Sequence, residues 1–323
     1  MTGGCAGAEM SAHAVAAPGA PGASGTEKVS LAYQVHGNPS TSVLLLMIAG
    51  LGQQLVAWHP DLVGELVGRG YAVAIFDHRD VGLSTHLHEL RVDLAAVREG
   101  RAAPPYTMAE LALDAGAVLD AVGWGSAHVL GVSMGGMVAQ QLAIAAPTRV
   151  RSLTSIMSTT GARDVGRPRP GTFQVLVQSP PADREKAAAH ALTVARLIGS
   201  PAHPAPAEEI LARARVAFDR AFDPRGVGRQ FAAILGSPDR TPLLGSVRCP
   251  TLVVHGEQDP LVDISGGRAT AAAVPGAESV LLEGMGHDLP RPLWPRILDA
   301  LDRVTGRGER CLTSPGEAPG PTA

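Results

Sequence analysis

The sequence predicts an α/β protein in which a mostly parallel, doubly wound sheet is flanked by helices and carries a helical cap insertion. Short aliphatic runs alternate with helical patterns along most of the chain, which is typical of βαβ units. The runs are almost continuously apolar, as expected for strands that are covered on both faces. One long stretch, residues 163–245, has helical patterns and Pro-rich joints but no convincing strand.

The expected core elements follow one another in a regular order. Six runs are expected to form parallel strands: Val43–Ala49, Tyr71–Phe76, His128–Val132, Val150–Met157, Thr251–Val254 and Ser279–Leu282. An earlier segment, Val29–Val35, is expected to supply an antiparallel edge strand. Helices are expected between the strands: Ala57–Gly68, Thr107–Val122, Met134–Ala146, Gly267–Val274 and Leu293–Val304.

These elements place the core in residues 26–162 and 246–305. Residues 163–245, inserted between two core strands, are expected to cap the carboxyl ends of the sheet, where ligands bind in open α/β folds. Both ends of the chain have the composition of linkers and lack apolar periodicity. We therefore expect a disordered N-terminal tail at residues 1–25 and a flexible C-terminal tail at residues 306–323.

Composition limits the expected partners and location. The formal net charge is −3 and aromatic residues make up 3%, so nucleic acid and anionic membranes are poor candidates as partners. Three cysteines share no metal-ligand spacing, and an odd number does not form a disulfide framework. The first residues lack the pattern of a signal peptide, and no apolar run reaches the roughly 20 residues of a membrane span. A cytoplasmic protein with free thiols is expected, while the oligomeric state stays open.

The strongest chemical signal is the run Gly131-Val-Ser-Met-Gly135. It lies between a predicted strand and a predicted helix, which is the context of a nucleophile elbow. A serine on such a tight turn has a strained backbone, so the residues two positions before and after it must be small, as Gly131 and Gly135 are. Ser133 is therefore the expected nucleophile, and a structural turn is the alternative.

A serine hydroxyl needs a base, and position selects His287 among the eleven histidines. His287 follows the last predicted strand, in a Gly-rich loop at the carboxyl edge of the sheet; a surface loop histidine is the alternative. His128 starts a strand on the opposite edge, and His255 lies in the turn of the expected acid. Four other histidines follow early elements and are expected at most to line the pocket: His59, His78, His86 and His88.

The orienting acid is expected between the serine and the histidine in chain order. The turn after Thr251–Val254 contains Glu257, Asp259 and Asp263. Asp259 is the preferred acid, and its two neighbours in the turn remain alternatives.

Two backbone N–H groups are expected to stabilise an oxyanion. One belongs to Met134, directly after the nucleophile. The other belongs to Leu51, in the Gly-rich loop Ala49-Gly-Leu-Gly52 that follows the first parallel strand. A plain strand-to-helix turn is the alternative for this loop.

Together these motifs resemble the α/β-hydrolase superfamily over about residues 29–304. The segments that carry the resemblance are Ala49–Gly52, Phe76–Ser84 (FDHRDVGLS), Gly131–Gly136, Gly256–Asp259 and Gly284–His287. Within the superfamily the chain is similar to bacterial ester hydrolases of the aclacinomycin methylesterase type, in which an Asp-His-Arg-Asp-x-Gly-x-Ser run follows the fourth core strand. Many members have His-Gly before the oxyanion residue, whereas this chain has Ala49-Gly50. The support that a histidine would give this loop is therefore expected to be missing.

The charged run Asp77-His-Arg-Asp80 could relay charge or bind a metal ion. Charges of mixed sign at a strand end more often form local salt bridges and hydrogen bonds that fix the loop. We expect that structural role here.

The resemblance and the site predict a serine hydrolase, of the α/β-hydrolase fold, that cleaves a carboxylic ester of a small molecule through an acyl-enzyme. No metal and no organic cofactor is implied. Ser133 counts against haloalkane dehalogenase and epoxide hydrolase chemistry, which uses an aspartate at the elbow. The alternatives are a perhydrolase or haloperoxidase-like enzyme without cofactor, a thioesterase, a lactonase, an acyltransferase, and a non-catalytic ligand-binding receptor, which would usually have lost a triad member.

Overall fold

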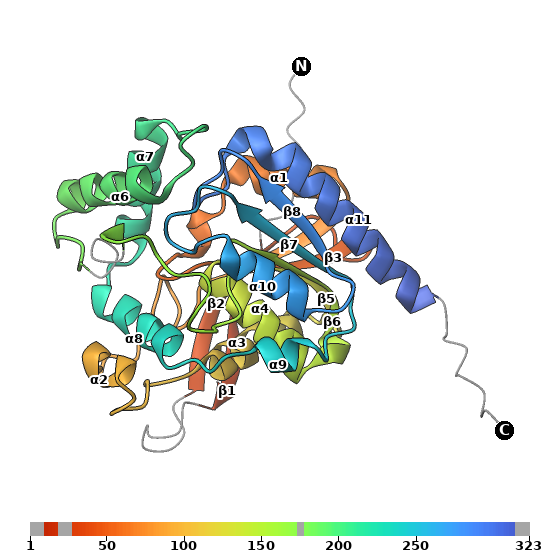
Figure 1. Ribbon diagram of the computed structural model, residues 1–323, viewed down its shortest axis with the longest axis horizontal. Coiled ribbons are helices and arrows are strands. Elements are labelled where there is room, and N and C mark those ends of the chain that lie inside the picture. The colour runs from red at the N-terminus through yellow and green to blue at the C-terminus, as the bar shows by residue number, and fades with distance from the viewer. Residues whose placement is uncertain (1–9, 19–27, 173–177, 314–323) are drawn as a thin grey trace.

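The computed structural model describes residues 10–18, 28–172 and 178–313 of the 323-residue chain (Figure 1). Its strands form one sheet in the order β1-β2-β4-β3-β5-β6-β7-β8. The strands are β1 (Met10–Pro18), β2 (Lys28–His36), β3 (Val43–Ile48), β4 (Tyr71–Phe76), β5 (Ala127–Val132), β6 (Val150–Ile156), β7 (Thr251–Gly256) and β8 (Glu278–Leu282). The strands β3 to β8 are parallel, as predicted, and β2 pairs antiparallel with β4.

Helices connect and cover these strands. The α-helices are α1 (Pro60–Gly68), α2 (Leu94–Arg98), α3 (Met108–Ala121), α4 (Met134–Ala145), α6 (Arg184–Ile198), α7 (Ala207–Arg220), α8 (Pro224–Leu235), α9 (Thr241–Leu244), α10 (Ser265–Ala273) and α11 (Trp294–Thr313). Three 3-10 turns are η1 (Leu55–Ala57), η2 (Pro147–Arg149) and η3 (Arg291–Leu293). Among the described residues, no helix is both long enough and apolar enough to cross a bilayer. The thiols of Cys249 and Cys311 are free, as predicted, while Cys5 lies outside the described residues.

The core consists of two apolar layers, one on each face of the sheet. Side chains of a strand point alternately to the two faces. In β3, Leu46 and Ile48 pack with side chains of α3 and α4, whereas Leu45 and Met47 pack with side chains of α1 and α11. This arrangement confirms the doubly wound sheet and explains why its strands are apolar at nearly every position.

The N-terminal side differs from the prediction. Residues Met10–Pro18, expected within a disordered tail, form β1, which pairs antiparallel with β2. The strand β1, and not the segment Val29–Val35, is therefore the edge of the sheet. The Ala-rich sequence of β1 favours a strand only weakly, and its pairing depends on backbone hydrogen bonds that a side-chain pattern does not report. The remainder of the predicted tail, residues 1–9 and 19–25, lies outside the described residues.

The C-terminal side differs as well. The helix α11 continues through Thr313, although residues 306–323 were expected to form a flexible tail. Gly306 and Gly308 lower the helix propensity and suggest an earlier end. Glu309 offsets this, because its carboxylate binds His128 of β5 and Arg151 of β6, each at 3.0 Å. Residues 314–323 lie outside the described residues.

The segment between β6 and β7 contains α6, α7, α8 and α9 and, among its described residues, no strand. Figure 1 shows α6, α7 and α8 together on one side of the sheet, at the left. We call the described residues of 163–245 the cap. Arg220 of α7 joins the cap to the core through an ion pair with the buried Asp77 (2.6 Å). Gln54 of the core donates from Nε2 to the carbonyls of Ala217 and Ala221, at 2.8 and 2.9 Å.

Candidate active site

Ser133 lies in the tight turn between β5 and α4. Its φ of 54° and ψ of −120° are rare for a residue with a side chain and cost on the order of 1–3 kcal/mol. The Ser133 N–H donates to the carbonyl of Ile156 (2.9 Å), and Ser158 Oγ donates to the Ser133 carbonyl (2.7 Å). The strand β6 and the residues that follow it therefore hold the strained turn in place.

Glycines on both sides of Ser133 make the turn possible. A Cβ on Gly131 would lie 2.1 Å from the carbonyl oxygen of Gly135. A Cβ on Gly135 would lie 2.1 Å from the carbonyl oxygen of Ile48 in β3. Both contacts are too short for any side chain, so the turn requires the small residues that the motif predicted.

His287 comes from the loop between β8 and η3, and its side chain is 7% exposed. Its Nε2 lies 3.0 Å from Ser133 Oγ, and its Nδ1 lies 2.7 Å from Asp259 Oδ2. With the proton on Nδ1, the imidazole donates to the carboxylate and presents Nε2 as an acceptor to the hydroxyl. The structure thus brings the three predicted side chains together.

Asp259 lies in the turn after β7, and its carboxylate is fully buried. Its Oδ1 accepts hydrogen bonds from the backbone N–H groups of Leu261 (2.8 Å) and Val262 (2.9 Å). These two hydrogen bonds fix the orientation of the carboxylate. The other oxygen, Oδ2, is left to face the imidazole of His287.

The two alternative acids in this turn lie elsewhere. The side chain of Glu257 is exposed. Asp263 Oδ1 accepts from the Ser265 N–H (3.0 Å) at the start of α10. Neither is brought to the imidazole of His287 by the contacts that it makes.

His255 stabilises the turn that carries Asp259 through a side-chain hydrogen bond. Its buried ring donates from Nε2 to the Val262 carbonyl (2.8 Å), and Nε2 lies 3.6 Å from Asp259 Oδ2. Burial lowers the pKa of His255, which favours the neutral ring in this position. His255 was expected within the turn itself, but it lies in β7 and contacts the turn through the Val262 carbonyl.

The loop of residues 49–52, which we call the oxyanion loop, adjoins the nucleophile. A Cβ on Gly50 would lie 3.4 Å from the Cβ of Ser133. Met134 is the first residue of α4, and the first N–H groups of a helix have no partner within the helix. The two expected donors, the N–H groups of Leu51 and Met134, therefore belong to segments that border Ser133.

Two glutamines brace the oxyanion loop, and neither was predicted. Gln53 Oε1 accepts from the Gly50 N–H at 3.0 Å, and Gln230 Oε1 accepts from the Gly52 N–H at 2.9 Å. The bonded groups lie directly before and after Leu51. Gln230 comes from α8, so the cap contributes to the geometry of this loop.

A histidine from another segment of the chain also supports the oxyanion loop. His78 is completely buried, and its Nε2 donates to the Ala49 carbonyl (3.1 Å). Burial lowers the pKa of His78 to about 4, so the ring is neutral. The expectation that histidine support would be missing is wrong, because the loop after β4 supplies it.

The charged run after β4 fixes its loop, as predicted, but not through local salt bridges. Three of its charges pair with residues of other elements: Arg79 with Asp114 of α3 (2.6 Å), Asp80 with Arg229 of α8 (2.7 Å) and Asp77 with Arg220 of α7 (2.6 Å). The sequence does not report these partners because tertiary packing brings them together. The run thus ties the core to the cap.

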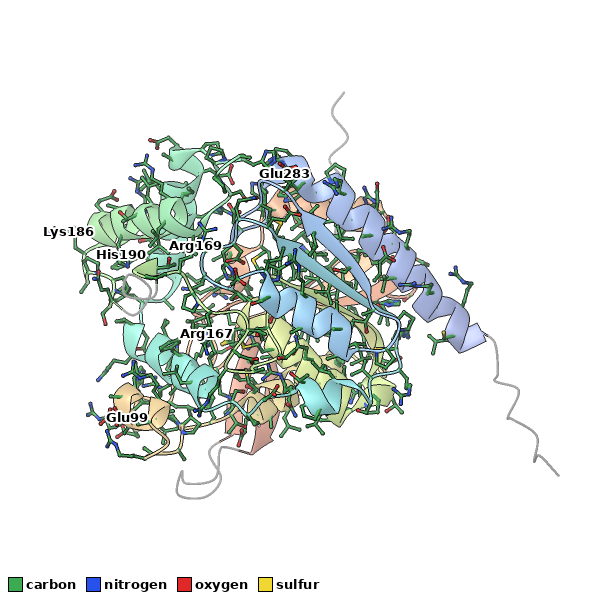
Figure 2. All side chains as sticks on the ribbon, in the orientation of Figure 1. Glu99, Arg167, Arg169, Lys186, His190 and Glu283 are labelled. Carbon is green, nitrogen blue, oxygen red and sulfur yellow. The ribbon has the colours of Figure 1, made fainter. Side chains whose placement is uncertain are left out.

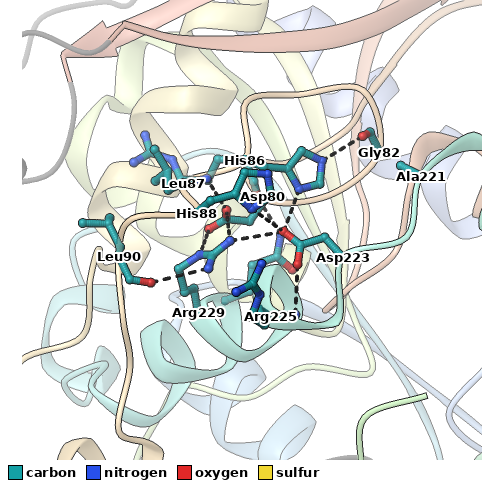
Figure 3. A network of polar contacts seen from close by, with 12 residues as sticks. Asp80, Gly82, His86, Leu87, His88, Leu90, Ala221, Asp223, Arg225 and Arg229 are labelled. Atoms are coloured by element: carbon teal, nitrogen blue, oxygen red, sulfur yellow. Dashed lines mark hydrogen bonds and ion pairs between the residues drawn. The ribbon is translucent and has the colours of Figure 1, made fainter. Parts of the chain in front are cut away.

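Among the described residues, His86, His88 and Asp223 form one group whose ligand atoms could approach a common metal ion (Figure 3). The two Nδ1 atoms lie 3.0 and 3.4 Å from Asp223 Oδ2. Arg229 donates to the same oxygen (3.3 Å), and the two imidazole rings are stacked with their centroids 5.5 Å apart. This arrangement is better suited to a polar contact between the β4 loop and α8 than to a cation.

The segment after β6 borders the turn that carries Asp259. Figure 2 labels Arg169 between α6 and the sheet, and its N–H donates to the carbonyl of Pro260 (2.8 Å). The start of the cap is thus fixed beside the candidate site.

Comparisons with known proteins assign the chain to a family. Residues 43–290 match the family model described as alpha/beta hydrolase fold. The chain is 32% identical to rhodomycin D methylesterase DnrP of Streptomyces peucetius, a match that covers 82% of this chain and 91% of the relative. The family match spans the cap and most of the core.

Solved structures show the same architecture. A hydrolase from Pseudomonas aeruginosa PA01 is 25% identical, with a TM-score of 0.60 over 88% of this chain and 95% of that chain. A putative lipase from Acinetobacter baumannii AYE is 19% identical, with a TM-score of 0.69 over 88% of this chain and 89% of that chain. At this low identity the second likeness concerns the fold alone.

Proposed function

Because the chain belongs to the α/β-hydrolase family, we propose that it is a serine hydrolase that cleaves a carboxylic ester of a small molecule. The observation that carries the proposal is the continuous hydrogen-bonded series from Ser133 through His287 to Asp259, at 3.0 and 2.7 Å. These side chains follow the carboxyl ends of β5, β8 and β7, where ligands bind in open α/β sheets.

In the first step Ser133 Oγ attacks the ester carbonyl and transfers its proton to His287 Nε2. The Asp259 carboxylate accepts a hydrogen bond from the Nδ1–H of the ring and stabilises the imidazolium that forms. The carbonyl oxygen becomes an oxyanion, which accepts hydrogen bonds from the N–H groups of Leu51 and Met134; one such donor lowers the barrier by roughly 2.7–4 kcal/mol.

Collapse of this intermediate breaks the bond to the alcohol oxygen, which takes the proton from His287, and leaves an acyl group on Ser133. A water molecule then gives a proton to His287 Nε2 and attacks the acyl carbon. The acid leaves as the proton returns to Ser133 Oγ. The residues therefore return to their starting state without a redox step.

The relative DnrP suggests which alcohol to test first. It is a methylesterase, and the match covers 91% of its length. We propose a methyl ester as the substrate class of this chain, with rhodomycin D as one compound of the panel.

We propose that the cap selects the acyl group. The end of α6 contacts the loop of His287 through a hydrogen bond from the His287 N–H to the Ile198 carbonyl (2.7 Å). From α8, Val227 approaches the oxyanion loop so closely that a Cβ on Gly52 would lie 3.1 Å from its methyl groups. An acyl group on Ser133 is therefore expected to meet both helices.

The function is tested with a panel of methyl esters of small and bulky acids, p-nitrophenyl esters of increasing chain length, and the matching thioesters and lactones. We expect methanol and free acid in equal amounts, and one ¹⁸O atom in the acid when the reaction runs in labelled water. Ser133→Ala should abolish this release. Hydrolysis that persists in folded Ser133→Ala would contradict the proposal, and a strong preference for thioesters, lactones or peroxide would reassign the substrate class.

A further inference from the structure

The loop that carries His287 is bonded to the end of a cap helix. The His287 N–H donates to the carbonyl of Ile198, the last residue of α6, at 2.7 Å. Four residues further along the cap, the Ala202 N–H donates to the Gly284 carbonyl at 3.4 Å. The backbone of the base is thus connected to α6 as well as to β8.

A single hydroxyl in this contact joins the residues on both sides of His287. Ser200 Oγ accepts from the Gly286 N–H at 2.9 Å and donates to Asp288 Oδ1 in a short hydrogen bond. Asp288 Oδ1 also accepts from the Ser200 N–H at 3.1 Å. Ser200 is only 2% exposed, so water cannot easily replace these bonds if the hydroxyl is removed.

The segment after α6 and the loop of His287 also lie too close together to slide past each other. A Cβ on Gly286 would lie 2.3 Å from the Gly199 carbonyl oxygen. A Cβ on Gly199 would lie 3.2 Å from Asp288 Oδ2. The segment after α6 therefore fits the loop of His287 in one position.

We propose that Ser200 and Asp288 are positioning residues for the base, so that the cap sets the placement of the His287 imidazole. The inference rests on the proposed function, in which His287 moves the protons. Asp288 and Asp259 have different roles. Asp288 Oδ1 accepts hydrogen bonds from Ser200, whereas Asp259 Oδ2 faces Nδ1 of the His287 ring. Both residues act through the backbone on either side of His287 and do not touch the reacting atoms.

Ser200→Ala should lower kcat about 10- to 100-fold with little change in KM, because a misplacement of about 1 Å in a catalytic group can cost about 10²-fold in rate. Ser200→Thr keeps the hydroxyl and should restore most of kcat. Asp288→Asn keeps an acceptor oxygen and should stay within about threefold, whereas Asp288→Ala should resemble Ser200→Ala. The double variant Ser200→Ala/Asp288→Ala should be little worse than either single variant, since both lose the same contact.

Proton NMR gives a readout that does not depend on turnover. The low-field signal of the Nδ1 proton, shared between His287 and Asp259, should shift or broaden in Ser200→Ala. Ser246→Ala is the control, because its exposed hydroxyl donates to the nearby Leu243 carbonyl at 2.7 Å, far along the chain from the loop of His287. Thermal unfolding of every variant separates misplacement from loss of fold, and Asp288→Ala decides if Ser200→Ala does not fold.

An unchanged kcat together with an unchanged low-field signal, in either folded alanine variant, would overturn the inference. Failure of the proposed function has a different signature. It would appear as ester hydrolysis that survives in Ser133→Ala, whatever the state of Ser200.

Discussion

The nucleophile and the base of the proposed triad are held by different parts of the molecule. Ser133 has its contacts within the core, from Ile156 at the end of β6 and from the packing of Gly135 against Ile48 in β3. The loop of His287 is bonded to β8 on one side and to Ile198 and Ser200 of the cap on the other. Strain at the elbow can therefore be sustained by the rigid sheet, whereas the base is correctly placed only while the cap is in place.

Asp259, the orienting acid, belongs to the core, and its loss should have the largest effect on kcat. Asp259→Asn keeps the shape of the side chain but favours the wrong imidazole tautomer, so kcat should fall by roughly 10⁴. Glu257→Gln and Asp263→Asn should stay within about tenfold, because their charges act on the site only through screened interactions. Steady-state kinetics on the three folded variants checks this. A crippled Asp263→Asn beside a normal Asp259→Asn would assign the acid to Asp263.

Ion pairs of the core and of the cap should also differ in what they contribute to the free energy of unfolding. Arg79→Met leaves the fully buried Asp114 without its partner, so the free energy of unfolding should fall by about 3–5 kcal/mol. The matched change Arg184→Met breaks an exposed pair with Asp219 on the cap and should hardly move the midpoint of urea unfolding. Equal losses in the two variants would show that the cap is as tightly integrated as the core.

Buried His78 should make the core sensitive to acid. Its pKa is lowered from the ordinary value of 6.5 to about 4 by burial, so the unfolded chain binds a proton that the folded chain does not between these values. Stability should therefore decrease as the pH falls from about 6.5 to about 4, by roughly 3 kcal/mol for this one group. His78→Gln should flatten that part of the curve of unfolding free energy against pH. Parallel curves for the two proteins would contradict the burial argument.

The smallest effect on catalysis is expected at the oxyanion loop, which is held by hydrogen bonds to both the core and the cap. Gln53→Ala, a core change, and Gln230→Ala, a cap change, each remove an acceptor beside Leu51 and should lower kcat about 10- to 100-fold. This is less than the 10²–10³-fold expected for losing an oxyanion donor itself, because the Leu51 N–H remains and only its position becomes less fixed. Gln141→Ala, on α4, is the control and should keep normal kcat. Equal activity in all three variants would show that the loop holds its shape alone.

The sequence could predict the features whose requirements are local. The elbow needs small residues two positions away from Ser133, and the run from Gly131 to Gly135 states that requirement directly. Continuous apolar runs likewise predicted the strands β3 to β8, and their alternation with helices predicted that they are parallel.

What the sequence could not predict depends on residues that are far apart in the chain. Gln230 reaches Gly52 across 178 positions, and Arg229 reaches Asp80 across 149. No spacing rule connects such pairs, since only the folded arrangement of cap and core brings them together. The strand β1 was missed for a related reason, because its Ala-rich sequence has no strand pattern and its place depends on pairing with β2.

Covalent labelling tests the central claim most directly. The protein is treated with a fluorophosphonate probe, and the modified peptide is identified and its rate of formation measured by mass spectrometry. The triad geometry predicts one adduct per chain, on Ser133, with no adduct in Ser133→Ala and a greatly slowed reaction in His287→Ala. Rapid labelling of another residue, or labelling that persists in folded Ser133→Ala, would contradict the account.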